Sequence, residues 1–322
     1  IDKFLNEAIE IDVDAVRDLN GDVFIAGIMQ HIEEAGVHSG DSACAIPTYS
    51  ISNSQIQLIK ENTIKMANEL DVKGLMNVQF AIKNEQIFVI EVNPRASRTI
   101  PFVSKSIGIS VAKIAAKCML GISIKEQKLP KNIKHKYCYV KEVVFPFLKF
   151  PGVDPILSPE MKSTGEVMGI GKNFGEAFAK SQIATNVTIP EKGTAFMSVK
   201  DEDKKYIVVV AKKLLKLGFE LVATNGTQNF LNENNIKCTR VNKVREGRTH
   251  IVDMIKNNQI DLIVNTTQSK QAIRDSYLIR REALQYKVCY TTTIAGANAL
   301  VGAIDYSKNL NVYKLQDIFK LA

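Results

Sequence analysis

The first part of the chain alternates polar and apolar residues in short runs that are separated by turns. Residues 9–16 alternate as a strand, and the Asn20-Gly21-Asp22 turn leads into a second strand at residues 23–28. Apolar positions at helical spacing predict helices over residues 54–70, 111–120 and 173–183, and alternation predicts a further strand over residues 136–147. Because alternation begins at once and the first residue is Ile1, we expect a fragment that enters its sheet midway.

Residues 75–93 predict a hairpin whose strands each have an apolar face and a more polar face. The apolar positions are even-numbered, with Met76, Val78, Phe80 and Ile82 on the first strand and Phe88, Ile90 and Val92 on the second. A two-residue turn at Asn84-Glu85 would pair odd with even positions, so we expect either a three-residue connection, 84–86, or a bulge. That register places Gln79 opposite Glu91, and Asn93 follows on the same face.

A regular alternation of short apolar strands and helices begins after residue 193. Strands are predicted at residues 194–199, 219–223, 237–241, 261–265 and 287–290, and helices at residues 202–217, 227–234, 248–257, 269–284 and 294–304. This order is typical of an open parallel sheet, and residues 186–193 form the predicted linker before it. We therefore expect an α/β protein with two domains, residues 1–186 and residues 187–322.

Composition narrows the class of protein. The chain has 322 residues, of which 45% are apolar and 24% are charged, as in ordinary globular proteins. No apolar run approaches the ~18–20 residues that cross a bilayer, and no signal pattern opens the chain. The five cysteines form no C-x-x-C pair, so we expect a cytoplasmic protein with reduced thiols and no membrane partner.

The net charge of +8 arises in the second part of the chain. Residues 187–322 contain 21 Lys and Arg against 13 Asp and Glu, whereas residues 1–186 contain 21 of each. The chain has no Trp and no basic patch interleaved with aromatic residues, so nucleic-acid binding is not expected. A small phosphorylated ligand accounts for this charge, and so does a solvated basic surface.

The predicted hairpin carries the first candidate site. Gln79, Glu91 and Asn93 offer only oxygen ligands, which suit Mg²⁺ or Mn²⁺ shared between protein and nucleotide phosphates. Arg95 and Arg98 follow directly, and guanidinium groups match phosphate oxygens. A solvated polar sheet face with two surface arginines explains the same residues without a ligand.

A second candidate site lies at one edge of the predicted parallel sheet. The strand at residues 219–223 runs into the Thr224-Asn225-Gly226-Thr227 turn and a helix N-terminus, which together suit an anion. Asn265-Thr266-Thr267 ends another strand at the same edge, where open α/β sheets bind ligands. Lys204 and Lys243 supply positive charge, whereas a simple helix cap is the alternative reading of the turn.

A set of motifs carries a specific family resemblance. In order they are Gly36-Val37-His38-Ser39-Gly40-Asp41-Ser42, Gly74-Leu75-Met76-Asn77-Val78-Gln79-Phe80, Ile90-Glu91-Val92-Asn93-Pro94-Arg95, Lys141-Glu142-Val143-Val144, Phe150-Pro151-Gly152-Val153-Asp154 and Asn242-Lys243-Val244-Arg245-Glu246-Gly247-Arg248. Across essentially all 322 residues the chain resembles the carboxyl-terminal part of carbamoyl phosphate synthetase large subunits. The resemblance implies part of an ATP-grasp domain (α+β) up to about residue 186, followed by a methylglyoxal-synthase-like regulatory domain with an open parallel sheet.

The resemblance also implies an activity and its partners. It implies an ATP-dependent ligase of the glutamine-hydrolysing type that phosphorylates carbamate to carbamoyl phosphate, for pyrimidine and arginine biosynthesis. The implied partners are ATP, carbamate, a separate small glutaminase subunit and effectors of the UMP or IMP type, and a homo-oligomer is left open. The fragment alone is expected to be inactive, because the first synthetase domain and one lobe of this ATP-grasp unit are absent.

Site residues carry over by motif match. The metals would be held by Gln79, Glu91 and Asn93, and catalysis would use Asn93, Arg95 and Arg98. The ATP site would be lined by Lys3, Leu5, Glu10, Gly36, Val37, His38, Ser39, Gln79 and Glu91. The nucleotide effector would meet Lys204, Thr224, Thr227, Lys243, Asn265 and Thr267, and ornithine would meet Glu33, Asp41, Glu142, Tyr290 and Thr292. The chain departs from the family pattern at Cys289, where a His often precedes the tyrosine.

Other readings remain open from sequence. Another ATP-grasp carboxylate ligase, such as a biotin carboxylase, would share the Glu-x-Asn-Pro-Arg motif but not the appended β/α domain. A nucleotide-sensing binding module with an inactive ATP-grasp remnant is the alternative from a different class. A free-standing methylglyoxal synthase is disfavoured, because Asn265-Thr266-Thr267 offers no carboxylate for the proton abstraction that it needs.

Overall fold

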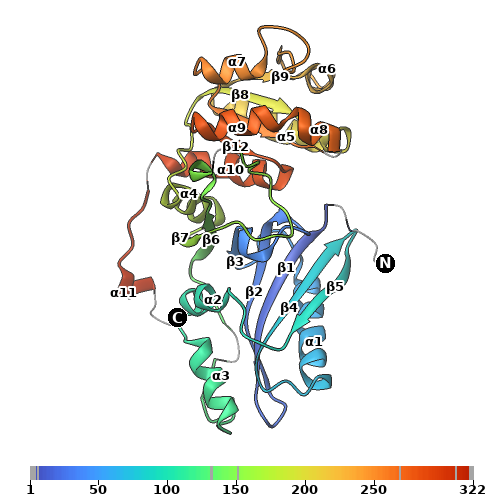
Figure 1. Cartoon of the computed structure of the whole chain (residues 1–322). Helices are drawn as coiled ribbons and strands as arrows, with labels where there is room; N and C mark the ends of the chain where they lie inside the picture. The colour runs from blue at the N-terminus through green and yellow to red at the C-terminus, as the bar shows by residue number, and fades with distance from the viewer. Residues whose placement is uncertain are drawn as a thin grey trace.

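Two β-sheets form the two ends of the molecule, with a pair of helices between them. The computed structural model describes residues 5, 7–130, 133–150, 152–267, 270–308 and 310–318. Helices α4 (Phe174–Ala184) and α10 (Ile294–Ser307) lie between the seven-stranded sheet and the five-stranded sheet (Figure 1). None of the described helices is both long enough and apolar enough to span a bilayer.

The larger sheet is antiparallel and has the strand order β5-β4-β1-β2-β3-β6-β7. Its strands are β1 (Ile9–Arg17), β2 (Val23–Glu34), β3 (Cys44–Ile46), β4 (Gly74–Lys83), β5 (Gln86–Asn93), β6 (Cys138–Val144) and β7 (Gly165–Gly171). Helix α1 (Asn53–Glu69) covers one face, whereas α2 (Ile100–Ile107) and α3 (Val111–Met119) pack on the other. Strand β1 lies between β4 and β2, so each of its edges is paired.

The side chains of β1 alternate between these two faces of the sheet. Ile11, Val13 and Ala15 pack with α1 in one apolar core. The intervening residues Glu10, Asp12 and Asp14 must then face the other side, because successive side chains of a strand point to opposite faces. This is the side on which the candidate site is found.

The hairpin has the predicted cross-strand pairs but a different connection. Strands β4 and β5 are joined by the two-residue turn Asn84-Glu85, whose residues have φ of 50° and 66°, as a hairpin turn with left-handed backbone requires. The three-residue connection was therefore wrong, and the bulge was right, since the register shifts between the Gln79–Glu91 and Phe80–Val89 pairs.

The bulge also corrects the expected apolar face of β5. Val89, not Ile90, lies opposite Phe80, and Phe88 lies opposite Ala81. Phe88 therefore shares the polar face with Glu91, and Ile90 lines the cavity described below.

The smaller sheet confirms the prediction of parallel β/α alternation. It has the order β10-β9-β8-β11-β12, and every pair is parallel. Its strands are β8 (Gly193–Ser198), β9 (Phe219–Ala223), β10 (Thr239–Arg240), β11 (Leu262–Asn265) and β12 (Cys289–Thr291). The helices are α5 (Lys204–Lys216), α6 (Asn225–Glu233), α7 (Ile251–Lys256), α8 (Lys270–Asp275), α9 (Tyr277–Gln285) and α10, so the helix expected over residues 269–284 is divided at Ser276.

The chain crosses back after α10 and ties the two sheets together. Tyr313, ahead of the short helix α11 (Leu315–Ile318), donates its hydroxyl to the Glu176 carboxylate on α4 at 2.7 Å. Asn311 donates to the same carboxylate at 3.1 Å, and the Lys180 ammonium lies 3.1 Å from it. The elements β3, β7, α2 and α11 were not predicted.

We predict that Gly169→Ala lowers the free energy of unfolding by ~1–3 kcal/mol, which is the usual cost of overpacking. A Cβ at Gly169 would lie 2.0 Å from the Ala177 carbonyl oxygen, so β7 and α4 would have to separate. Gly302→Ala is the matched control, because a Cβ there meets nothing within 4 Å and helical Ala is favoured over Gly by ~1 kcal/mol. Urea unfolding followed by circular dichroism measures both, and equal midpoints would contradict this account of the junction.

Candidate functional site

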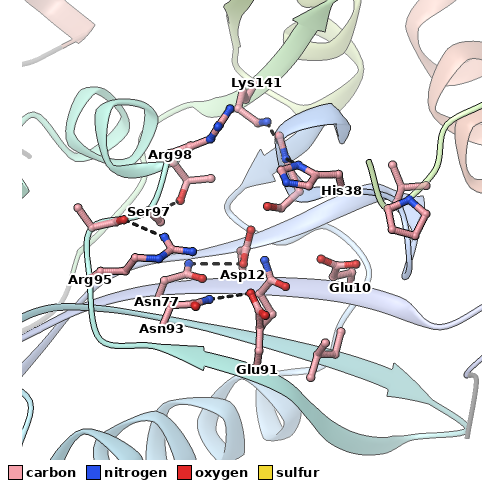
Figure 2. Close-up of a pocket in the computed structure, with 18 of the residues that line it drawn as sticks. Glu10, Asp12, His38, Asn77, Glu91, Asn93, Arg95, Ser97, Arg98 and Lys141 are labelled. Carbon is pink, nitrogen blue, oxygen red and sulfur yellow. Dashed lines mark hydrogen bonds between the residues drawn. The ribbon is translucent and has the colours of Figure 1, made fainter. Parts of the chain in front are cut away.

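A cavity of about 730 Å³ opens on the polar side of β1, β4 and β5. Its floor is formed by these strands, and its rim by the 36–40 loop, the 93–99 loop and Lys141 from β6 (Figure 2). The cavity brings together most of the residues expected at an ATP-grasp site: Glu10, Gly36, Val37, His38, Ser39, Gln79, Glu91, Asn93, Arg95 and Arg98. Leu5 is described but is not among the lining residues, and Lys3 lies outside the described residues.

Two rows of polar side chains cross the floor because of strand register. Gln79 on β4 pairs with Glu91 on β5 and, across its other edge, with Asp12 on β1. Two residues along β4, Asn77 pairs with Asn93 and Asp14 in the same way. The Asn93 amide donates to the Glu91 carboxylate at 2.7 Å, which leaves the Asn93 carbonyl oxygen as its acceptor atom.

The oxygen atoms of this floor fit a divalent cation shared with a ligand. Gln79, Glu91 and Asn93 offer one carboxylate and two amide carbonyl groups, which is the hard oxygen set that Mg²⁺ or Mn²⁺ accepts. Among the described residues no group of three or more His, Cys, Asp or Glu side chains is placed to hold a metal ion. Mg²⁺ takes about six oxygen ligands, so three side chains leave positions for oxygens of a bound molecule.

Three cationic side chains line the same cavity. Arg95 and Arg98 project from the loop that follows β5, at the end of the cavity away from Glu10 (Figure 2). Lys141, which the sequence analysis did not include among the site residues, is only 1% exposed and donates to the Ser39 carbonyl oxygen at 3.3 Å. Burial lowers the pKa of Lys141, but nearby Cys44 and Glu166 outweigh it and the pKa is raised, so the ammonium stays charged.

The 36–40 loop is held by its own side chains. The His38 imidazole Nδ1 accepts a hydrogen bond from the Gly40 backbone N–H at 3.0 Å, and the His38 backbone N–H donates to the Ser158 carbonyl at 3.0 Å. These bonds fix a short 3₁₀ turn, Ser39–Asp41, at the rim of the cavity. Small residues here let the backbone approach a ligand closely.

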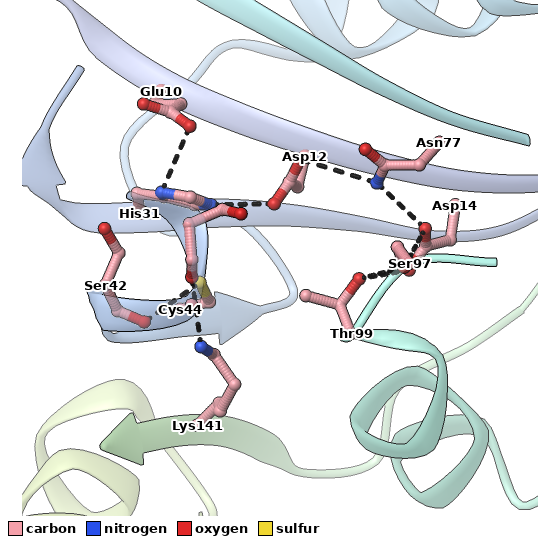
Figure 3. A network of polar contacts seen from close by, with 12 residues as sticks. Glu10, Asp12, Asp14, His31, Ser42, Cys44, Asn77, Ser97, Thr99 and Lys141 are labelled. Atoms are coloured by element: carbon pink, nitrogen blue, oxygen red, sulfur yellow. Dashed lines mark hydrogen bonds and ion pairs between the residues drawn. The ribbon is translucent and has the colours of Figure 1, made fainter. Parts of the chain in front are cut away.

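A chain of buried polar contacts joins the floor of the cavity to β2 (Figure 3). His31 on β2 is completely buried, with its Nε2 3.1 Å from the Asp12 carboxylate and its Nδ1 3.6 Å from the Glu10 carboxylate. Burial lowers the pKa of His31, but Cys44 and Asp12 more than compensate, so the pKa is raised well above its usual value. Burial also raises the pKa of Glu10. The sequence analysis missed Asp12, Asp14 and His31; the signal for the two acids was their period-2 spacing with Glu10.

The expected anion site is partly assembled at the carboxyl edge of the smaller sheet. The Lys204 ammonium lies 3.4 Å from where a Cβ would stand at Gly226, in the first turn of α6. The Thr227 hydroxyl accepts from the Val199 backbone N–H at 3.2 Å, and the Thr224 hydroxyl donates to Ser198 at 3.1 Å.

The other expected effector residues lie near the ends of β10 and β11. Asn265 ends β11, is 3% exposed, and its side-chain N–H₂ group has no hydrogen-bond partner in the described part of the chain. Thr267, two residues after Asn265, is partly exposed. Lys243 is exposed, and its backbone N–H donates to the Glu246 carboxylate at 3.0 Å.

The residues expected at an ornithine site come from both parts of the chain. Glu142 is buried on β6, and the Glu33 carboxylate is near enough to raise its pKa further. Asp41 accepts backbone N–H bonds from residues 162 and 163 at 2.7 and 2.9 Å, which explains its complete burial. Tyr290 and Thr292 lie at the end of β12, in the other sheet.

Comparisons with known proteins match both parts of the chain. Residues 1–127 match a family model described as the carbamoyl-phosphate synthase L chain, ATP binding domain, and residues 206–292 match the MGS-like domain. The carbamoyl phosphate synthase large chain of Pseudomonas syringae pv. tomato is 57% identical over 99% of this chain and 30% of its own length. The chain belongs to the carbamoyl phosphate synthase large-chain family. It matches the large chain of Xanthomonas axonopodis pv. citri at 52% identity, again over 99% of this chain and 30% of that relative.

The match covers the carboxyl-terminal part of the family pattern, and the chain spans about 30% of the length of these curated relatives. Among solved structures, the biotin carboxylase domain of the Hydrogenobacter thermophilus 2-oxoglutarate carboxylase overlays with a TM-score of 0.46 and 13% identity. That overlay covers 57% of this chain and 46% of the other.

Glu142 gives a pH-dependent prediction for stability. Burial, with the Glu33 charge, raises the pKa of Glu142 from 4.5 to about 8. Between these values the folded state keeps a proton that the unfolded state releases, so stability falls as pH rises through the window. The glutamine of Glu142→Gln cannot ionise. We therefore expect the free energy of unfolding of the variant, relative to that of the wild type, to rise between about pH 5 and about pH 8 by on the order of 1–3 kcal/mol.

Urea unfolding at several pH values measures this difference. Glu160→Gln, on an exposed segment, controls for the loss of one negative charge. A difference between Glu142→Gln and wild type that stays constant with pH would contradict the assignment.

Proposed function

We propose that this chain is the nucleotide-binding and phosphoryl-transfer part of a carbamoyl phosphate synthase large chain, acting on carbamate with ATP. The observation that carries the proposal is the single cavity in which Gln79, Glu91 and Asn93 face Arg95 and Arg98. Phosphoryl transfer asks a protein mainly to position reactants and to neutralise developing charge, and this combination of oxygen ligands and fixed cations does both.

Each part of the cavity has a proposed task. Glu10 and the 36–40 loop bind the nucleoside, since this rim presents backbone groups and small residues next to a carboxylate. Gln79, Glu91 and Asn93 would hold Mg²⁺ or Mn²⁺, which offsets phosphate charge when bound. Arg95 and Arg98 contact the phosphoryl oxygens from the opposite end of the cavity, and Lys141, whose ammonium donates to the Ser39 carbonyl, adds a third positive charge.

We also assign a regulatory role to residues 187–322, with residues 1–186 as the catalytic part. Lys204, Thr224, Thr227 and Asn265 at the sheet edge suit the phosphate of a nucleoside monophosphate such as UMP or IMP. An ornithine-type effector would use the set Glu33, Asp41, Glu142, Tyr290 and Thr292, of which Asp41 already has two backbone donors.

The proposal also covers the source of nitrogen, the cellular compartment and the pathways that the product enters. The nitrogen would come from glutamine through a small glutaminase subunit, in the cytoplasm, for pyrimidine and arginine biosynthesis. The isolated 322-residue chain is proposed to be inactive, so the assays below use the full-length protein that contains it. The alternative, a nucleotide sensor with an inactive ATP-grasp remnant, predicts the same effector binding but no effect of cavity variants on turnover.

We predict that Glu91→Gln in the full-length protein lowers carbamate-dependent ATP turnover at least ~100-fold, because phosphoryl transfer loses a charged ligand at its centre. Glu85→Gln removes the same charge from the exposed turn of the same hairpin and should leave turnover unchanged. Steady-state measurement of carbamoyl phosphate formation decides the question. Activity of Glu91→Gln within a few-fold of wild type would favour the inactive-remnant alternative.

We predict that UMP or IMP binds the second part of the chain through its phosphate. Lys204→Ala should weaken binding by roughly 1–3 kcal/mol, the scale of a lost charge-assisted hydrogen bond. Lys212→Ala is the matched control, since it removes the same charge from an exposed position on the same helix.

Isothermal titration calorimetry at two salt concentrations measures the affinities, which should fall as salt rises. Uridine and inosine should bind much more weakly than their monophosphates. Equal affinity for nucleoside and nucleotide would contradict a phosphate site.

A further inference from the structure

The loop that carries the two cavity arginines has no regular structure of its own. It runs from Asn93, at the end of β5, to Thr99, at the start of α2, and Arg95 and Arg98 are exposed within it. The Arg95 guanidinium donates to the Ala96 carbonyl oxygen at 3.0 Å, which is a contact inside the loop, whereas the Arg98 guanidinium contacts the Met161 sulfur. Neither contact ties the backbone of the loop to the sheet, so a contact between the loop and the sheet must set where the loop stands.

Two inward-pointing hydroxyls supply that contact. Ser97 Oγ donates to Asp14 Oδ1 at 2.7 Å, and Thr99 Oγ1 donates to Asp14 Oδ2 at 2.5 Å (Figure 3). Arg98 lies between them in sequence, and all three residues line the cavity. The two residues that bond to Asp14 therefore flank Arg98 directly.

The Thr99 hydroxyl bonds to the sheet and does not cap the helix that Thr99 precedes. Thr99 is the N-cap of α2, where a hydroxyl ordinarily accepts a backbone N–H of the first turn. Here it makes no such capping bond and turns instead toward Asp14. Pro101, in the first turn of α2, has no backbone N–H to offer, and the hydroxyl proton goes to the Asp14 carboxylate instead.

Asp14 is itself fixed on the other side. It is completely buried on the central strand β1, and its Oδ1 also accepts from the Asn77 amide of β4 at 2.9 Å. Asn77 is the residue that pairs with Asn93 across β4 and β5. The carboxylate therefore joins the arginine loop to the same row of the floor that carries the Asn93 ligand atoms.

We propose that Asp14 is a positioning residue that clamps the 93–99 loop, through Ser97 and Thr99, so that Arg95 and Arg98 are held over the oxygen ligands of the floor. This inference rests on the proposed function for its catalytic consequence, whereas the clamp itself is a property of this chain alone.

Proton counting shows which substitution can replace Asp14. Ser97 Oγ and Thr99 Oγ1 are also 2.7 Å apart, so three contacts join three groups, but two hydroxyls bring only two protons. The carboxyl group supplies the third proton when Asp14 is protonated. An amide N–H₂ group in place of Oδ2 would supply it at any pH, while the amide oxygen in place of Oδ1 still accepts from Ser97 and Asn77. Burial raises the pKa of Asp14 to about 6. The hydrogen bonds that Asp14 accepts lower its pKa, but burial outweighs them, and the charge of Asp12 raises the pKa further. Asp14→Asn should therefore keep the clamp, whereas Asp14→Ala removes it.

The first experiment measures the clamp without using activity. Hydrogen exchange of this chain, followed by mass spectrometry, should show faster exchange in the 93–99 segment for Asp14→Ala and for the Ser97→Ala/Thr99→Val double variant. Asp14→Asn should restore the wild-type rate. Ser106→Ala is the matched control, because it removes a buried hydroxyl of α2 that bonds only to the Val103 carbonyl oxygen. Unchanged exchange in the double variant overturns the proposal.

The second experiment measures the consequence in the full-length protein. Per folded enzyme, the double variant should lower kcat for carbamate-dependent ATP turnover by ~10–100-fold, the scale of a misplacement of about 1 Å. KM for ATP should stay within ~3-fold, because positioning acts on the transition state rather than on nucleotide binding. Asp14→Asn should keep kcat within ~5-fold of wild type, which a merely structural defect would not predict. If Asp14→Ala does not fold, the double variant alone decides.

Failures of the two proposals are distinguishable. Arg98→Ala is the reference, and if it leaves turnover unchanged, the proposed function is wrong whatever the exchange data show. If Arg98→Ala abolishes turnover but the Ser97→Ala/Thr99→Val variant matches Ser106→Ala in kcat, the arginines are catalytic and the clamp is not needed. That result overturns the inference and leaves the proposed function standing.

Discussion

The burial of acidic side chains along the central strand β1 is the constraint on which the rest of the site depends. Glu10, Asp12 and Asp14 are 3%, 1% and 0% exposed, although each carries a carboxyl group. A buried carboxyl group is tolerated only with hydrogen-bond donors or a compensating charge, and both neighbouring strands supply them. His31 from β2 and Asn77 from β4 point at these acids, so the sheet cannot satisfy its own interior without assembling the floor of the cavity.

Sequence patterns predicted the residues that β4 and β5 contribute to the floor of the cavity, but they missed Asp12 and Asp14 of β1. Alternation along the hairpin placed Gln79 opposite Glu91, because a period of two survives in each strand whatever the connection. The bulge in β5 was not decided by sequence, since it depends on which side chains the two strands pair. The acids of β1 have the same alternation as a solvated face, and only pairing with β2 and β4 on both edges makes them buried.

The five-stranded sheet was the easier prediction, for a physical reason. Its strands are parallel and covered by helices, so they appear in the sequence as apolar runs between amphipathic helices. Strand β7 was not predicted because glycines, which weaken a strand pattern, occupy two of its positions. Gly169 and Gly171 leave room for α4, since a Cβ at these positions would lie 2.0 and 2.5 Å from backbone atoms of that helix. Such glycines are recognisable only once the partner helix is known.

The junction between the sheets combines contacts of different strength. Lys200 follows β8; its backbone N–H donates to the Thr266 hydroxyl at the sheet edge, and its ammonium lies 2.6 Å from the Glu7 carboxylate, just before β1. The Glu7 side chain is 37% exposed, so water and salt weaken that pair. Glu176, only 1% exposed, instead accepts from the side chains of both Tyr313 and Asn311 and lies 3.1 Å from the Lys180 ammonium. Coupling between sites needs an element with two accessible arrangements, and the exposed pair, unlike the buried one, can open at little cost in free energy.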